Sequence, residues 1–258
     1  MKKLLCDKKF NILYSLFAVL LMWAVWFIAA AATGNEYLVV PVGSTLSEFF
    51  ALFSKAFFWK ALSHTLLRTL ITFLISFALA LACACLSVAF KPFAAFMRPI
   101  AAFFRTLPTM AVLLLILTSL KQRAAPVAVA FLVLFPMIYS QLTDSISSVD
   151  GGLLQMARVY GMPLHKRLAC IYLPHLAPVT LKQTGGNLAF GLKIVISAEV
   201  MAPTHTAIGG MLGEANVYSM PRLAALTLVA VALGILFEAV FAVIANHAFK
   251  WKKAESND

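Results

Sequence analysis

The sequence predicts an all-α integral membrane protein with six transmembrane helices and both termini in the cytoplasm. Three observations predict this class. The 258-residue chain is 62% hydrophobic and 12% charged, with a mean hydropathy of +0.91, whereas soluble domains carry about 25% charged residues. Six apolar runs follow one another, and none shows the two-residue alternation of a membrane β-barrel strand. Lys and Arg residues gather in short clusters between these runs.

Each apolar run can cross a hydrocarbon core of ~30 Å at a rise of about 1.5 Å per residue. The N-terminus, with Lys2 and Lys3 ahead of the first run, resembles a signal peptide. The 21 uncharged residues of this run, Ile12 to Ala32, exceed the usual apolar core of about 7–15 residues, so we expect a retained helix. Pro108 should kink the third run, because proline removes an intrahelical hydrogen bond. The chain is thus one transmembrane domain over residues 1–258, with predicted spans at 12–32, 62–88, 100–120, 124–142, 188–204 and 223–245.

The positive charge follows the topology that these spans impose. With the N-terminus inside, 14 of the 21 Lys and Arg residues lie on or beside the inner segments. Two more lie within spans, and five are outside: Lys55, Lys60, Lys121, Arg123 and Arg222. This bias is the one expected of cytoplasmic loops. We therefore attribute the net charge of +11 to membrane orientation and expect no nucleic-acid partner.

The longest polar interval between two spans, residues 143–187, contains signals for two short helices. Asp150 can cap a helix that begins after it, and Gly161 can end that helix in a left-handed conformation. Pro163 suits the first turn of a second helix, and Pro174 should disrupt the chain beyond it. The prediction is a basic helix–turn–helix on the cytoplasmic side, over about residues 150–175. An ordinary basic loop that only satisfies topology fits the spacing equally well, whereas DNA binding is disfavoured because the membrane holds both ends of the loop.

The same interval resembles a known docking motif. Gln155-Met156-Ala157, Gly161, Ile171 and Pro174 follow the spacing of the EAA loop in the membrane subunits of ABC importers (Glu-Ala-Ala-x3-Gly-x9-Ile-x2-Pro). In that family the loop is a coupling helix that docks on an ATP-hydrolysing partner. Gln155 stands where the motif has Glu and Met156 where it has Ala, so a salt bridge from position 155 is excluded. The resemblance implies a docking surface made by Gln155, Met156, Ala157, Gly161, His165, Lys166, Ile171 and Pro174.

Further segments are similar to the nitrate/sulfonate/taurine-type branch of these permeases. They are Thr65-Leu66-Leu67-Arg68, Arg105-Thr106-Leu107-Pro108, Ser197-Ala198-Glu199-Val200-Met201 and the basic Lys250-Trp251-Lys252-Lys253. Their order and spacing extend the resemblance over roughly residues 40–250. It implies the type I ABC importer (MetI-like) permease fold in the bacterial inner membrane. It also implies three partners: a second permease copy in a homodimer, a cytoplasmic ATP-binding subunit, and an extracytoplasmic solute-binding protein. The solute would be a sulfonate-, nitrate- or taurine-like anion, or a thiamine-precursor-like vitamin.

Three ionisable residues lie well within the last four spans: Lys193, Glu199 and Glu238. Charges in hydrocarbon cost about 2.5–3.5 kcal/mol on insertion scales, so these side chains should face protein or water. Lys193 and Glu199 are six positions apart and cannot pair on one helix face. We hypothesise that Glu199 and Lys193 lie on the translocation path or its gate. A structural contact with a neighbouring helix is the open alternative for Glu199 and the favoured one for Lys193 and Glu238.

No catalytic constellation is present in the sequence. It has no glycine-rich phosphate loop and no His-Glu metal helix, and the four cysteines lack metal-ligand spacing. We therefore expect no enzymatic activity, cofactor or metal in this chain. Energy must come from a separate ATP-binding subunit or, alternatively, from an ion gradient, as in an ion-coupled secondary transporter. That alternative predicts intramembrane carboxylates and two corresponding halves, but carboxylates are few and no internal repeat is visible.

Overall fold

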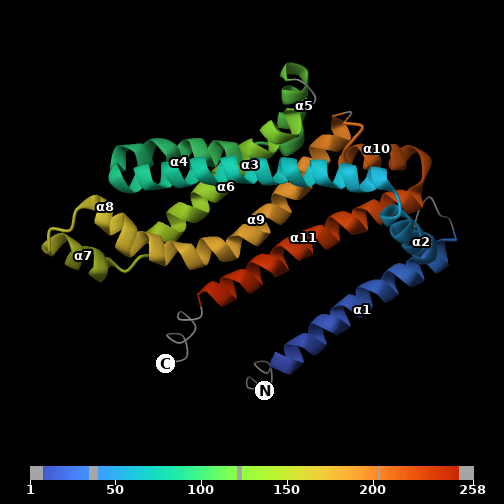
Figure 1. The fold of residues 1–258 in the computed structure, drawn as a ribbon, viewed down its shortest axis with the longest axis horizontal. Helices are drawn as coiled ribbons and strands as arrows, with labels where there is room; N and C mark the ends of the chain where they lie inside the picture. Colours follow the sequence, from blue (N-terminus) through green and yellow to red (C-terminus); the bar gives the residue numbers. More distant parts are fainter. Residues whose placement is uncertain (1–7, 35–39, 121–123, 203, 250–258) are drawn as a thin grey trace.

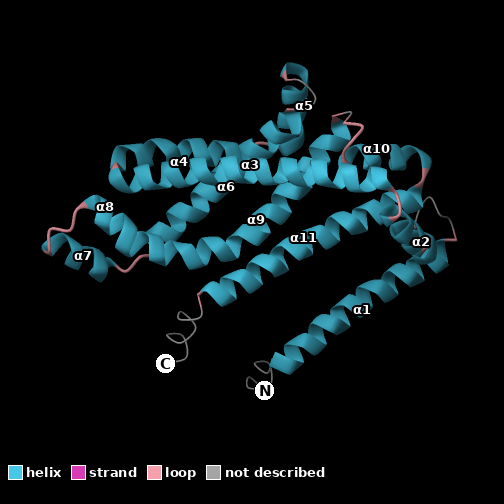
Figure 2. Cartoon of the chain, viewed as in Figure 1, coloured by secondary structure: helices cyan, strands magenta, loops and turns pink. Residues whose placement is uncertain are grey.

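The computed structural model describes residues 8–34, 40–120, 124–202 and 204–249, and the regular structure in these ranges is entirely helical (Figure 2). The basic segment Lys250–Lys253 and the loop residues Lys121 and Arg123 lie outside the described residues. The elements are α1 (Lys8–Thr33), α2 (Val42–Phe53), α3 (Ala56–Ala89), α4 (Lys91–Thr106), α5 (Thr109–Ser119), α6 (Ala125–Ser147), α7 (Gly151–Val159), α8 (Leu164–Arg167), the π-helical turn η2 (Leu168–Tyr172), α9 (Leu173–Met201), α10 (Ile208–Tyr218) and α11 (Met220–Ala248).

Helix α9 is the central element of the bundle. It packs against α11, α6, α3 and α10, and Figure 1 shows it running between α6 and α11. One apolar cluster joins α9 to α2, α3, α10 and α11, and a second joins α3, α4 and α6 and reaches α9 through Leu188. Helix α1 lies beside this bundle and packs against α2 (Figure 1). The helix at the centre of the fold, α9, is therefore also the least apolar of the long helices.

Small residues explain how closely α3 packs. Ser76, Ala80 and Ala84 repeat at four-residue spacing and are fully buried. Ala80 and Ala84 belong to the cluster that contains Leu134 and Ile138 of α6. Small side chains let two helix backbones approach closely in a membrane protein. This stripe therefore packs against a helix of the same subunit. From the sequence alone, contact within the subunit and contact across a dimer were both possible.

The structure supports four to five of the six expected spans by length and composition. Helices α1, α3, α6 and α11 are each long and apolar enough to cross a bilayer, and α4 with α5 forms a fifth candidate that is bent by 94°. Helix α9 has 29 residues but contains Lys182, Lys193 and Glu199, and it is not among these candidates. The expected all-helical membrane fold is confirmed, whereas the count of six stays a prediction.

Two prolines behave differently from each other. The bend between α4 and α5 falls at Leu107-Pro108, as the sequence predicted. The expectation that Pro174 disrupts the chain is wrong, because the helical path continues through α9 to Met201, and the fifth apolar run is the second half of a longer helix. In η2 the N–H of Leu173 donates to the carbonyl of Leu168, five residues back. This wider turn relieves the clash and the missing hydrogen bond that proline brings to an α-helix.

The connecting elements gather at two opposite ends of the molecule. Helices α7 and α8 lie at one end, together with the turn between α3 and α4, and helices α2 and α10 lie at the other (Figure 1). The segments expected on the cytoplasmic side and those expected outside are thus separated along the long axis. Their assignment to the two sides of a membrane stays a prediction from the charge distribution.

Candidate functional site

Local hydrogen bonds determine the shape of the α7–α8 segment. The Asp150 carboxylate accepts the N–H of Gly152 at 2.9 Å, which confirms the predicted cap. At the other end of α7, Gly161 has a φ of +63°. The N–H of Met162 donates to the carbonyl of Ala157 at 2.9 Å, and the N–H of Gly161 donates to Arg158 at 3.0 Å. These two bonds form a Schellman motif, in which glycine is favoured at the left-handed position.

The exposed surface of this segment includes an apolar patch beside polar and basic residues. Met156, Val159 and Tyr160 are exposed, with Val159 at 85% and Tyr160 at 81%. Ala157, which the resemblance places in the docking surface, is 1% exposed and packs inside the chain. Sequence reasoning missed Val159 and Tyr160, although two large apolar side chains beside a helix-ending glycine were the available signal. A protruding apolar patch marks a surface for a partner.

The remaining docking residues of the motif lie on α7, α8, η2 and the start of α9. Gln155, His165, Lys166 and Pro174 are exposed, and Ile171 is half-buried. Ser148 and His175 bond through Oγ and Nε2 at 3.1 Å and link the end of α6 to the start of α9. The predicted second helix therefore exists, but it continues through η2 into the central helix. Such π-turns are frequent at functional positions, and here one joins the protrusion to the bundle.

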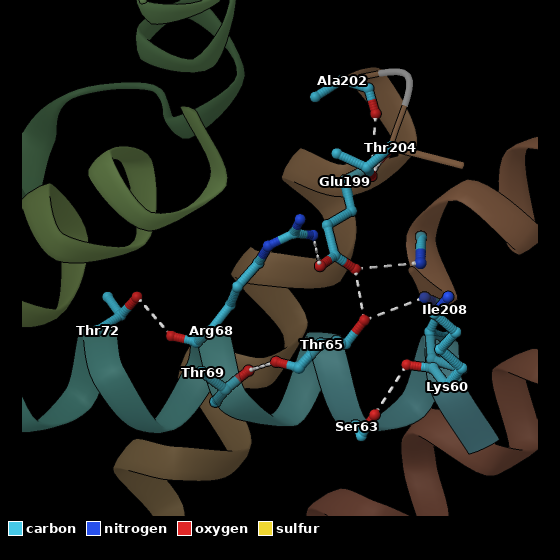
Figure 3. Close-up of polar contacts among 11 residues, drawn as sticks. Lys60, Ser63, Thr65, Arg68, Thr69, Thr72, Glu199, Ala202, Thr204 and Ile208 are labelled. Carbon is cyan, nitrogen blue, oxygen red and sulfur yellow. Dashed lines mark hydrogen bonds and ion pairs between the residues drawn. The ribbon is translucent and has the colours of Figure 1, made fainter. Parts of the chain in front are cut away.

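A second polar site is buried where α3, α9 and α10 meet (Figure 3). Arg68 Nη1 donates to Glu199 Oε1 at 2.7 Å, and Thr65 Oγ1 donates to Glu199 Oε2 at 2.8 Å. The Glu199 side chain is 0% exposed and that of Arg68 is 18% exposed. A buried carboxylate is tolerated when it is paired and its remaining lone pairs are used, and both conditions hold here.

The same carboxylate fastens the beginning of α10. Gly209 N–H donates to Glu199 Oε2 at 3.2 Å, and Ile208 N–H donates to Thr65 Oγ1 at 3.0 Å. These are free N–H groups of the first turn of α10, where a negative charge is also favoured by the helix dipole. A Cβ at Gly209 would overlap the Glu199 Cβ and the Ile196 carbonyl, so only glycine permits this approach. The cluster therefore joins three helices that are far apart in sequence.

The charged residues that the sequence grouped together are separated by the structure. Lys193 does not pair with Glu199, as the helix spacing predicted. The partner of Glu199 is Arg68. Lys193 and Glu238 are exposed and line one hollow between α9 and α11. Glu199 thus makes the contact with a neighbouring helix that was held open as an alternative. Its place relative to a translocation path stays a prediction.

Comparison with known proteins gives the family. The sequence pattern described as "Binding-protein-dependent transport system inner membrane component" matches residues 75–250. The chain belongs to this family. It is therefore a multi-pass inner-membrane protein and a transporter component rather than an enzyme, and an ABC importer permease by class. The matched region includes the α7–α8 protrusion and Glu199.

Solved structures agree on the fold. The chain is similar to a protein described as "Crystal structure of a bacterial ABC transporter involved in the import of the acidic polysaccharide alginate". The TM-score is 0.67 at 15% identity, over 94% of this chain and 97% of that chain. It is also similar to a chain of a "bacterial alginate ABC transporter in complex with alginate pentasaccharide-bound periplasmic protein", with a TM-score of 0.60 at 16% identity, over 93% and 94% of the two chains. No curated protein matches the sequence.

Proposed function

We propose that the chain is the membrane-spanning subunit of an ATP-driven importer, and that α7 and α8 dock on a cytoplasmic ATP-binding subunit. The observation that carries this proposal is the exposed apolar face of Met156, Val159 and Tyr160 on a protrusion of fixed shape. Gly161 and Asp150 hold this shape through backbone hydrogen bonds. Closure of the ATP-binding subunits would push on α7–α8, and η2 would pass the displacement to the central helix α9.

The buried Arg68–Glu199 cluster connects this movement of α9 to other helices. Glu199 at the far end of α9 holds α3 and the start of α10. A displacement that enters α9 through η2 is therefore delivered to α10 at the opposite end. In this proposal Glu199 braces the outer gate, while Lys193 lies on the solute path.

The remaining parts of the transporter follow from the family. A second permease copy completes the path, and an extracytoplasmic binding protein delivers the solute at the α10 end. Sulfonate-, nitrate- or taurine-like anions and thiamine-precursor-like vitamins are the candidate solutes from the motif resemblance. Alginate, which the similar solved transporters import, is a further candidate.

The experiment is to purify the affinity-tagged chain from its native membranes in mild detergent and to measure ATP hydrolysis in proteoliposomes. We expect an ATP-binding subunit to copurify and ATP to be hydrolysed, although this chain has no nucleotide-binding motif of its own. A pure permease preparation without ATP hydrolysis would contradict the proposal. Uptake that persists without ATP and stops when ionophores collapse the ion gradients would favour the secondary transporter.

A further inference from the structure

Helix α9 is covered by the rest of the chain on all sides except one narrow stripe. Between residues 182 and 201 the exposed positions recur at intervals of four, four, three, four and four residues, which is one face of an α-helix. The residues between them are mostly buried. The stripe consists of Lys182, Gly186, Phe190, Lys193, Ser197 and Met201.

Helix α11 forms the second wall beside this stripe. A hollow of about 340 Å³ lies between the two helices. Its lining is mostly apolar and includes four polar residues, Lys193, Ser197, Thr227 and Glu238. A second hollow of about 480 Å³ is also lined by Glu238 and continues past Gln141 and Lys182. The two hollows both border Glu238, and together they are named the α9 groove.

The groove cannot face lipid. Lys193 and Glu238 are exposed, and neither has an ion-pair partner among the residues that the structure describes. An unpaired charge in hydrocarbon is costly, so such side chains face water or protein. Ser197 of α9 and Thr227 of α11 add one hydroxyl to each wall. A water-filled path provides the solvation that both charges need.

The two charges lie at different levels of the groove. Helices α9 and α11 run in opposite directions, and a Cβ at Gly185 would lie 2.8 Å from the Glu238 Cα. Glu238 is therefore level with Gly185. Lys193 is eight residues farther along α9, which is about 12 Å at the helical rise. From the α10 end, a solute would meet Ser197 and Thr227 first, then Lys193 and finally Glu238.

We propose that this groove is the part of the solute path that this subunit lines. Lys193 and Glu238 then select for a small solute that carries both a negative and a positive group. The inference rests on the proposed function, since it takes the chain to be a permease. Lys193 attracts an anionic group and repels a small cation. Glu238, farther from the α10 end, attracts a cationic group and repels a small anion. A solute with both groups has a partner at each level, whereas a polyanion such as alginate is repelled at Glu238.

Charged thiol reagents test the groove without knowledge of the solute. In the full transporter, with Cys6, Cys83, Cys85 and Cys170 replaced by Ser, single cysteines are introduced as Ser197→Cys and Ile235→Cys. Ser197 is one turn from Lys193, and Ile235 is one turn from Glu238; both line the first hollow. The control is Leu74→Cys, an exposed apolar position on α3. Membrane-impermeant methanethiosulfonates of either charge are applied from each side of membrane vesicles.

We expect both groove cysteines to react from at least one side, and Leu74→Cys to remain unmodified. At Ser197→Cys the anionic reagent should react about five-fold faster than the cationic one, because the nearby positive charge of Lys193 attracts it through moderately screened water. At Ile235→Cys the preference should reverse, because the nearby charge is that of Glu238. Lys193→Gln should abolish the first preference and Glu238→Gln the second. Lys193→Arg should retain the first, which separates charge from a folding defect.

Two results would overturn the proposal. If neither groove cysteine reacts faster than Leu74→Cys, the groove does not face water. If both cysteines prefer reagents of the same sign, the two-charge selection is wrong. ATP hydrolysis measured in the same vesicles distinguishes these failures from a failure of the proposed function. Groove cysteines that react as expected in vesicles without ATP hydrolysis would contradict the ATP-driven mechanism and leave the groove in place.

Discussion

The α7–α8 protrusion and the Arg68–Glu199 cluster are two regions with opposite origins. The protrusion is built by contacts within a few residues, such as Asp150 to Gly152 and Met162 to Ala157. The cluster joins residues 131 positions apart. One is exposed and the other is buried. The protrusion, which is proposed to meet a partner, is thus shaped by local contacts. The cluster, which holds the helices together, depends on the whole fold.

The two regions should therefore respond differently to substitution. Changes in the cluster should lower the stability of the whole bundle, because three helices lose a shared buried contact. Changes in the protrusion should leave the bundle intact and affect only the partner interface.

Arg68→Met should cause the largest loss. It leaves Glu199 buried without its cation, and breaking a buried pair in this way costs about 3–5 kcal/mol. The measurement is the free energy of unfolding of the purified subunit in detergent. The double variant Arg68→Met/Glu199→Gln should recover more than half of the loss, because the uncompensated charge is gone. A single variant as stable as the wild type would show that the pair does not support the fold.

Thr65→Val should have the next largest effect. It removes the donor to Glu199 and the acceptor for the N–H of Ile208, and groups left unsatisfied in a buried site cost about 1–3 kcal/mol. Thr65→Ser keeps the hydroxyl and should unfold close to the wild type. The same unfolding measurement serves both variants. A Val variant as stable as the wild type would mean that the Thr65 hydroxyl does not support the cluster.

Gly161→Val should change the protrusion and spare the bundle. A β-branched residue at a φ of +63° is strained by about 1–2 kcal/mol, so the Schellman bonds at Gly161 and Met162 should weaken. Hydrogen exchange should accelerate at these amides and stay unchanged in α3 and α9. Gly161→Asn, which tolerates the left-handed region, is the matched control. Faster exchange in α9 as well would contradict the local character of this region.

Asp150→Ala should have the smallest effect. Removing a helix cap costs about 1 kcal/mol, and here it concerns only the first turn of α7. Exchange at the amide of Gly152 should become faster, whereas Asp150→Asn should keep it slow. An Ala variant that exchanges as slowly as the wild type would mean that the cap adds nothing beyond the backbone.

The same contrast explains what the sequence could predict. Asp150, Gly161 and Pro108 act through their own backbone neighbourhood, so the cap, the left-handed turn and the bend were all predictable. Glu199 was recognised as a charge in need of a partner, but its partner depends on how α3 and α9 pack. Arg68 was the remaining cation in a neighbouring span and was the signal for the pair. Val159 and Tyr160 were missed because the motif directs attention to Gln155, Met156 and Ala157, of which Ala157 is buried.

The continuity of α9 was also beyond the sequence. Pro174 normally ends an α-helix, and only the π-turn at Leu168–Tyr172 lets the helix continue. Likewise, the uncovered stripe with Lys193 and Ser197 becomes visible only when the buried faces of α9 are known. Both features depend on how neighbouring helices surround α9.

The proposed docking of the ATP-binding subunit on the α7–α8 protrusion can be tested directly, because the chain contains its own control. Val159 and Tyr160 are exposed at the protrusion, and the same dipeptide, Val217-Tyr218, is exposed by 71% and 82% at the end of α10, at the opposite end of the molecule. The measurement is the amount of ATP-binding subunit retained by the tagged permease after purification. Val159→Asp/Tyr160→Asp should lose at least about nine-tenths of it, because charges in an apolar contact are costly, whereas Val217→Asp/Tyr218→Asp should retain it fully. Equal retention by both variants would contradict the account.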